Sequence, residues 1–168
     1  MVITSHEHYP QKCKNLKSRV QVNEKNSPKE YCSWEKVELL TKILAHKIKK
    51  SNIKKYDTIL SITNGGIIPA RLMARELNIN YIQFIPIRNK KLYKQEMPLL
   101  TKYKKYLIID EIYDTGDTFY KVFDVVRTFN CDFAFLIRRY KDNINNDTRR
   151  IYVGKILNHN KWIVFPWE

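Results

Sequence analysis

Short apolar runs alternate with amphipathic stretches along most of the chain. Helical spacing of apolar residues predicts helices at residues 34–50, 67–77 and 119–129, and Ser33 is placed to cap the first of them. Uninterrupted apolar runs predict strands at residues 57–63, 80–87, 106–109, 132–139 and 151–156. Strands that alternate with helices in this way are typical of an α/β fold, a central parallel sheet flanked by helices.

Three segments fall outside this pattern. Residues 1–30 are polar and basic, which predicts a flexible or loosely docked extension before a single domain at 31–168. Residues 89–105 are basic and irregular, and a connection of this length within a compact domain is usually a lid or a disordered loop. Residues 141–150 are predicted to be a polar connector.

The stretch at 106–118 carries the strongest chemical signal in the chain. It begins with a buried strand, which Asp110 and Glu111 follow directly, and Asp114 comes three residues after Glu111. A turn of small polar residues then opens a helix: Thr115, Gly116, Asp117 and Thr118. Ligands bind at the carboxyl ends of parallel strands, and such a turn offers N–H groups to a phosphate. Carboxylates beside it can accept from sugar hydroxyls or hold a hydrated metal ion, so the predicted ligand is a phosphorylated sugar.

The same turn has a purely structural interpretation. Asp and Thr are common helix caps, so Asp114 or Thr115 could serve only to begin the helix. However, three carboxylates within five positions repel one another, and a cap needs only one. We therefore favour a binding site.

Two other corners carry candidate chemistry. The loop after the strand at 57–63 contains Asn64, Gly65 and Gly66. Paired glycines let a backbone approach a ligand closely, although a plain turn would use the same residues. The strand at 132–139 ends in Arg138 and Arg139, at the sheet edge where a ligand is expected.

Composition fits one globular domain. The chain has 168 residues, of which 43% are hydrophobic and 12% aromatic. No apolar run reaches membrane-spanning length. The cysteines Cys13, Cys32 and Cys131 are scattered, lack metal-ligand spacing and suit a reducing cytoplasm, with Cys131 expected in the core.

The formal net charge of +14 permits nucleic-acid binding and also suits a polyanionic small substrate. Basic residues are spread over many segments rather than gathered in one helix. A general basic surface is therefore favoured over a dedicated nucleic-acid face.

The stretch at 106–118 resembles the phosphoribosyl pyrophosphate signature of the type I phosphoribosyltransferases. The tail at 161–168, Lys-Trp-Ile-Val-Phe-Pro-Trp-Glu, resembles that of bacterial and archaeal xanthine-guanine and hypoxanthine-guanine phosphoribosyltransferases. The resemblance covers residues 33–168. It implies a parallel α/β sheet with a small C-terminal hood, a homo-oligomer, and Mg²⁺-dependent transfer of phosphoribose to guanine, xanthine or hypoxanthine.

For the sugar donor, the resemblance implies three groups of residues. Asp110 and Glu111 would hold the ribose diol and Mg²⁺. The turn of Thr115, Gly116, Asp117 and Thr118 would wrap the 5′-phosphate, with the Asp117 carboxylate pointing outward. The loop of Asn64, Gly65 and Gly66 would bind the pyrophosphate, and residues 89–105 would form a mobile loop over the substrate.

For the base, the resemblance implies a set of residues near the hood. Trp162 would stack on the purine, backbone groups of Ile163 would read its edge, and Arg139, or next Arg138, would donate to its oxo group. Asp114 would act as general base, and Trp167 would pack the tail onto the domain.

The chain departs from the family pattern at three places. Asn64 and Arg139 replace the usual basic residue and the usual lysine, and residues 89–105 lack the usual Ser-Tyr pair, with Tyr93 the nearest aromatic residue. Two alternatives stay open. The first is a phosphoribosyl pyrophosphate sensor that binds nucleic acid without catalysis, which the net charge and Asn64 permit but which has no obvious need for Trp162. The second is an enzyme for another base, such as a pyrimidine.

Overall fold

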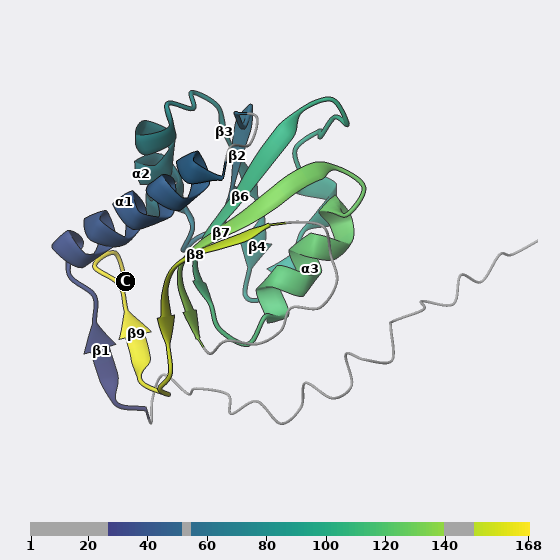
Figure 1. Cartoon of the computed structure of the whole chain (residues 1–168). Coiled ribbons are helices and arrows are strands. Elements are labelled where there is room, and N and C mark those ends of the chain that lie inside the picture. Colours follow the sequence, from purple (N-terminus) through teal and green to yellow (C-terminus); the bar gives the residue numbers. More distant parts are fainter. Residues whose placement is uncertain (1–26, 52–54, 140–149) are drawn as a thin grey trace, which may run out of the picture.

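The computed structural model of the chain describes residues 27–51, 55–139 and 150–168. Its main sheet is built from β2 (Thr58–Ile62), β3 (Ile82–Ile85), β6 (Lys105–Tyr113), β7 (Asn130–Arg139) and β8 (Ile151–Leu157). These strands lie in the order β3-β2-β6-β7-β8 and all neighbours are parallel (Figure 1). The predicted parallel α/β sheet is confirmed.

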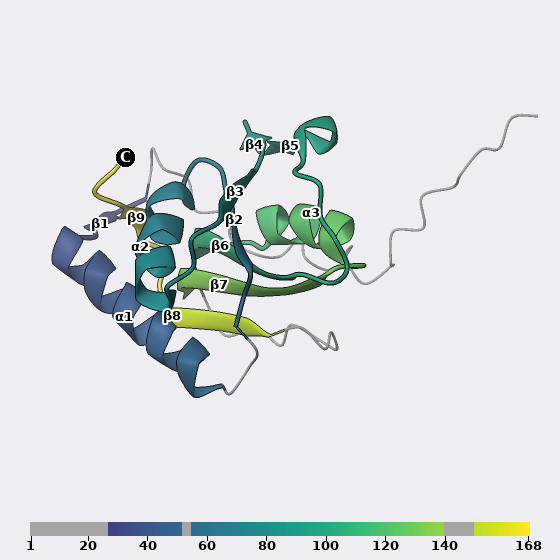
Figure 2. The same cartoon turned by 90° about the horizontal axis from the view of Figure 1, so that it is seen from above.

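Helices cover both faces of the sheet. They are α1 (Trp34–Lys50), α2 (Ile67–Leu77) and α3 (Asp117–Val126). Helices α1 and α2 lie on one face and α3 on the other (Figure 2). As predicted, α1 begins after Ser33, whose hydroxyl accepts a hydrogen bond from the N–H of Lys36 at 3.3 Å.

The central strands are buried on both faces, which explains their continuous apolar runs. In β6, Leu107 and Ile109 pack into the core beneath α1 and α2, whereas Tyr106 and Ile108 pack into the core beneath α3. Burying one such side chain contributes about 1.5–3 kcal/mol. Two apolar layers therefore hold β6 in place, and its last residues carry the acidic groups.

A second, smaller sheet forms the hood. Strands β1 (Lys29–Tyr31) and β9 (Trp162–Val164) pair in parallel, and the Trp162 N–H donates to the carbonyl of Pro28 at 2.8 Å. The sequence predicted a hood from the C-terminal tail alone, but Lys29 and Glu30, which we assigned to the extension, belong to its second strand. The prediction for the rest of the extension concerns residues 1–26, which lie outside the described residues.

Glu30 fastens the hood to its surroundings. Its carboxylate accepts a hydrogen bond from Lys36 Nζ at 2.7 Å, and its Oε2 lies 2.9 Å from Nε2 of His159. Lys36 lies in α1 and His159 lies in the connection between β8 and β9. The hydrogen bond from Lys36 lowers the pKa of Glu30, so its carboxylate is stabilised where these three segments meet.

The segment predicted as an irregular loop has local structure. Strands β4 (Ile87–Arg88) and β5 (Lys91–Leu92) form a hairpin, and a 3-10 helix follows at Lys94–Glu96. The turn residues Asn89 and Lys90 have φ of 50° and 60°, which suits a two-residue hairpin turn.

Side chains hold this hairpin in place. The Arg88 guanidinium donates to both carboxylate oxygens of Glu96, at 2.8 and 2.6 Å, and Lys121 Nζ of α3 donates to the Lys90 carbonyl at 2.8 Å. The expectation of an irregular segment is therefore wrong for residues 87–96. These residues lack apolar periodicity, but ion pairs and a tight turn give them a defined structure. The predicted connector at 141–150 lies outside the described residues except for Arg150.

Two further sequence predictions concern the burial of the cysteines and the length of apolar segments. Cys131 is buried as expected, and Cys32 is buried as well, whereas Cys13 lies outside the described residues. Among residues 27–51, 55–139 and 150–168, no helix has the length and apolar character needed to span a membrane.

Candidate functional site

The candidate site residues come from the carboxyl ends of β2, β6 and β7 and from the hood. Strand β6 runs on to Tyr113, so Asp110 and Glu111 lie within the strand rather than after it. Parallel pairing with β7 continues through this region, where Asp110 lies opposite Phe135. The acidic groups are therefore held by a rigid sheet backbone, which suits a preorganised site.

Asp110 and Glu111 are adjacent, substantially buried carboxyl groups. Asp110 has 9% of its surface exposed, and its Oδ1 accepts the N–H of Glu111 at 2.9 Å. Burial, reinforced by the neighbouring Glu111 charge, raises the pKa of Asp110 well above its usual range. Burial also raises the pKa of Glu111 to about 7, against the lowering effect of a hydrogen bond from Trp167. A positive charge from a ligand would stabilise this pair.

Asp114 pairs with Arg139 at the end of β7. Arg139 Nε donates to Asp114 Oδ1 at 2.5 Å, and the Arg139 side chain is only 2% exposed. Its Nη1 donates to the backbone carbonyls of His159 at 2.6 Å and Lys161 at 3.0 Å. Arg139 therefore joins the acidic turn to the connection that leads to Trp162.

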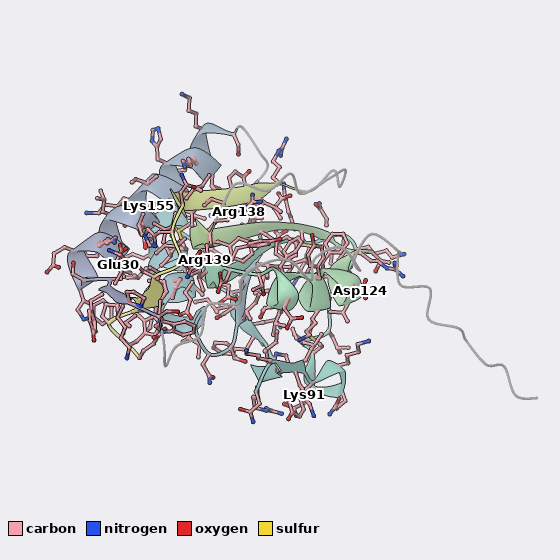
Figure 3. All side chains as sticks on the ribbon, turned by 90° about the horizontal axis from the view of Figure 1, so that it is seen from below. Glu30, Lys91, Asp124, Arg138, Arg139 and Lys155 are labelled. Atoms are coloured by element: carbon pink, nitrogen blue, oxygen red, sulfur yellow. The ribbon has the colours of Figure 1, made fainter. Side chains whose placement is uncertain are left out.

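Arg138 takes a different direction from Arg139. Its guanidinium lies over the ring of Tyr113, 5.1 Å from the ring centre. In Figure 3 both arginines lie at the end of β7, with Glu30 of the hood to one side. Of the two arginines that the sequence offered, Arg139 is the one that lines the pocket described below.

The turn at 115–118 forms the start of α3. Gly116 has φ of 86°, a left-handed conformation that favours glycine, and it is the N-terminal cap residue of the helix. The first N–H groups of a helix have no acceptor within the helix and can bind an anion. The Asp117 side chain is 59% exposed and pairs with Lys121 one turn along α3, so its carboxylate lies outward as expected.

The loop after β2 is anchored by Thr63. Its hydroxyl accepts the Ile87 N–H at 2.9 Å and bonds the Ile85 carbonyl at 3.1 Å. A Cβ atom on Gly66 would come within 2.5 Å of the Ile109 carbonyl oxygen, so only glycine fits against the backbone of β6 there. Asn64 is exposed at the tip of this loop.

A pocket of about 80 Å³ brings several predicted residues together. Its lining consists of Glu111, Ile112, Asp114, Arg139, Trp162, Ile163, Phe165 and Glu168. The acidic strand end, the basic strand end and the hood thus meet at one place. The turn at 115–118 and the loop at 64–66 do not line this pocket; they occupy neighbouring corners of the same sheet edge.

The pairing of the hood strands determines which backbone groups can face the pocket. The Trp162 N–H bonds the Pro28 carbonyl, and the Val164 carbonyl accepts the N–H of Cys32 at 2.8 Å. In a parallel pair, alternate residues of a strand bond the same neighbour. The N–H and carbonyl of Ile163 therefore point away from β1.

Sequence reasoning missed Trp167 as a polar contact of the site. Its indole N–H donates to Glu111 Oε2 at 2.9 Å. The only available signal was a tryptophan in the tail, and tryptophan is more often a packing residue. The partner of its N–H lies 56 positions earlier in the chain, which local patterns cannot reveal.

A parallel sheet in which a strand leads through a glycine-containing turn into a helix is typical of nucleotide and sugar-phosphate binding proteins. The model of the phosphoribosyl transferase domain family matches residues 29–168, so the chain belongs to that family and the predicted membership is confirmed.

Individual relatives agree with this assignment. A xanthine-guanine phosphoribosyltransferase of Desulfotalea psychrophila is 30% identical over 142 residues, covering 81% of this chain and 84% of the relative. One of Cereibacter sphaeroides is 24% identical over 151 residues, covering 82% and 86%. The solved structure of a purine phosphoribosyltransferase from Pyrococcus horikoshii has a TM-score of 0.59 and 29% identity, covering 83% of this chain and 94% of that one.

Proposed function

We propose that this protein is a purine phosphoribosyltransferase that joins guanine, xanthine or hypoxanthine to phosphoribosyl pyrophosphate. The products would be a nucleoside monophosphate and pyrophosphate. Family membership and relatives that match over most of both chains support this activity. The structural observation that carries the proposal is a pocket that Glu111, Asp114, Arg139 and Trp162 line together.

The donor would lie across the sheet edge. Asp110 and Glu111 would accept hydrogen bonds from the ribose hydroxyls, because their carboxylates lie at the end of β6. The N–H groups at the start of α3, in the turn at 115–118, would bind the 5′-phosphate. The backbone of Asn64, Gly65 and Gly66 would approach the pyrophosphate.

Asp110 and Glu111 would hold a divalent cation, because Asp110 is buried beside the charge of Glu111 and a cation there would offset the repulsion. Within the described ranges no cluster of three or more His, Cys, Asp or Glu side chains could hold a metal ion alone. Mg²⁺ commonly binds one or two carboxylates and completes its shell with water and substrate phosphate oxygens. When bound, Mg²⁺ would supply positive charge that stabilises the pyrophosphate leaving group.

The base would lie in the pocket beneath the hood. Trp162 would stack on the purine, a contact worth about 1–3 kcal/mol. The backbone N–H and carbonyl of Ile163 would read the base edge, and the Arg139 guanidinium would donate to the oxo group. Asp114, held by Arg139, would accept the proton of the reacting ring nitrogen.

The bond changes follow from these positions. A ring nitrogen of the base forms a bond to the anomeric carbon, while the bond from that carbon to the pyrophosphate oxygen breaks. The electron pair leaves with pyrophosphate, and the ring N–H proton passes to Asp114. The hood would exclude water, which protects the cationic sugar from hydrolysis.

The direct test uses purified full-length protein with phosphoribosyl pyrophosphate and Mg²⁺. Guanine, xanthine, hypoxanthine and, as a control, uracil are supplied separately, and nucleotide is detected chromatographically. We expect product with at least one 6-oxopurine and none without Mg²⁺. Product with uracil alone would replace the purine assignment by a pyrimidine one.

The nucleic-acid-binding regulator is not favoured, because the relatives are named as enzymes. Its signature in the same test would be no product with any base, together with salt-sensitive RNA or DNA binding. A homo-oligomer and a cytoplasmic location remain predictions, to be checked by light scattering and by cell fractionation.

A further inference from the structure

The tail that follows β9 folds back onto the acidic end of β6. The indole Nε1–H of Trp167 donates to Oε2 of Glu111 at 2.9 Å. An indole N–H can only donate, and a carboxylate acceptor makes the hydrogen bond charge-assisted, so this contact favours one oxygen of the ionised carboxylate.

The indole ring is itself held in a fixed orientation. It stacks on Phe165, with ring centres 4.9 Å apart and planes 14° from parallel, and Phe165 is almost fully buried. On another side it meets Trp34 of α1, with ring centres 5.8 Å apart. Aromatic contacts of this kind add about 0.5–1.5 kcal/mol beyond area burial. Contacts with Phe165 of the core and with the half-exposed Trp34 therefore orient the Trp167 N–H.

Glu111 is also confined by the glycine loop. A Cβ atom on Gly65 would lie 2.1 Å from Glu111 Cδ and from Oε1, so the carboxyl group packs directly against the glycine backbone. The carboxyl group is thus held between Gly65 and Trp167. Two segments far apart in the chain set its position, which side-chain torsions alone would leave broad.

We propose that Trp167 is a positioning residue for the phosphoribosyl donor: its N–H holds the Glu111 carboxylate in the orientation that accepts the ribose hydroxyls. This inference rests on the proposed function and adds a residue that the sequence assigned to packing. Trp167 does not touch the reacting atoms; it acts through Glu111.

The test compares Trp167→Phe with Trp34→Phe. The first variant keeps an aromatic ring beside Phe165 but removes the N–H, and the second is a matched control in the same aromatic cluster. Donor binding is measured by calorimetry with phosphoribosyl pyrophosphate and Mg²⁺, and the KM of the base is measured separately. We expect Trp167→Phe to weaken donor binding about tenfold, while the KM of the base and the melting temperature stay close to those of the control.

A second readout needs no substrate. The indole N–H resonance of Trp167 is identified by its loss in Trp167→Phe, and its hydrogen exchange is followed in the otherwise unmodified protein. We expect the exchange to accelerate in Glu111→Ala, because the acceptor is removed. Unchanged exchange would show that the contact is absent and would overturn the inference.

The two proposals fail in different ways. Donor binding by Trp167→Phe as tight as that of the unmodified protein would overturn the positioning role alone. An equal loss of donor binding in Trp34→Phe would assign the effect to general packing and would also overturn it. If the unmodified protein bound no donor, the proposed function itself would fail, whatever the variants did.

Discussion

Arg139 Nε and Asp114 Oδ1 lie 2.5 Å apart, and this ion pair between a buried arginine and a partly exposed aspartate connects the end of β7 to the turn after β6. Through Nη1, the same guanidinium binds two backbone carbonyls of the connection that leads to Trp162. A lysine has one ammonium group and cannot span these three acceptors in the same way. The arginine therefore couples the proposed general base to the proposed stacking residue.

Replacing Arg139 by Lys should loosen the hood while keeping the charge next to Asp114. Loss of hydrogen bonds to the His159 and Lys161 carbonyls should lower the free energy of unfolding by about 1–3 kcal/mol. The KM of the base should rise more than the KM of the donor. Urea unfolding measures the free energy of unfolding, and steady-state kinetics measure the two KM values. If the free energy of unfolding and the KM of the base were both unchanged, Arg139 would not couple the two residues.

Asp114→Asn should separate binding from turnover. The amide can still accept from Arg139 but is a far weaker base, so kcat should fall by about 10²–10⁴-fold. Calorimetric affinity for phosphoribosyl pyrophosphate should stay within a few-fold. Full turnover by this variant would exclude Asp114 as the general base.

The adjacent glycines Gly65 and Gly66 should respond differently to alanine. A Cβ on Gly65 meets the end of the Glu111 side chain, which can move, so Gly65→Ala should weaken donor binding with little change in stability. A Cβ on Gly66 meets the carbonyl oxygens of Ile109 and Ile62 at 2.5 and 2.6 Å, which cannot move without disturbing the sheet. Gly66→Ala should therefore cost about 1–3 kcal/mol of stability. Thermal unfolding and calorimetry on both variants check the contrast, and the reverse pattern would contradict it.

Glu111→Gln should change the pH dependence of stability. The pKa of Glu111 is raised from 4.5 to about 7, so the native protein holds a proton in this range that the unfolded chain has released. The contribution of Glu111 to stability therefore falls as pH rises through this interval and is constant above it.

The variant removes this contribution, so it should gain stability relative to the unmodified protein more at about pH 8 than at about pH 5. Thermal unfolding without Mg²⁺ measures the difference in stability between the variant and the unmodified protein at each pH. An equal difference in stability at both pH values would show that burial does not raise the pKa of Glu111.

Trp162→Ala should remove the stacking surface for the base. The KM of the base should rise by roughly 5- to 100-fold, which corresponds to the loss of about 1–3 kcal/mol. Donor binding should change little, because Trp162 is expected to contact the base alone. Trp162→Phe, which keeps a ring, should recover most of the affinity; no recovery would argue against stacking.

The sequence alone determined the helix at Trp34–Lys50 with its Ser33 cap, the parallel strands, and the order of acidic and glycine-rich corners. These features depend on side chains close together in sequence, so periodicity and turn chemistry reveal them. The family motif at 106–118 is local for the same reason.

Only the tertiary structure decided the contacts between distant segments. Contacts between residues far apart in the chain include the Trp167 bond to Glu111 and the pairing of β1 with β9. They also include the Arg139 bonds to Asp114 and to the connection before β9. The strand on which each side chain lies determines which distant group it can reach. The order of residues along the chain does not show these directions. The sequence therefore shows that a tryptophan or an arginine can donate hydrogen bonds, but only the folded structure shows which group accepts them.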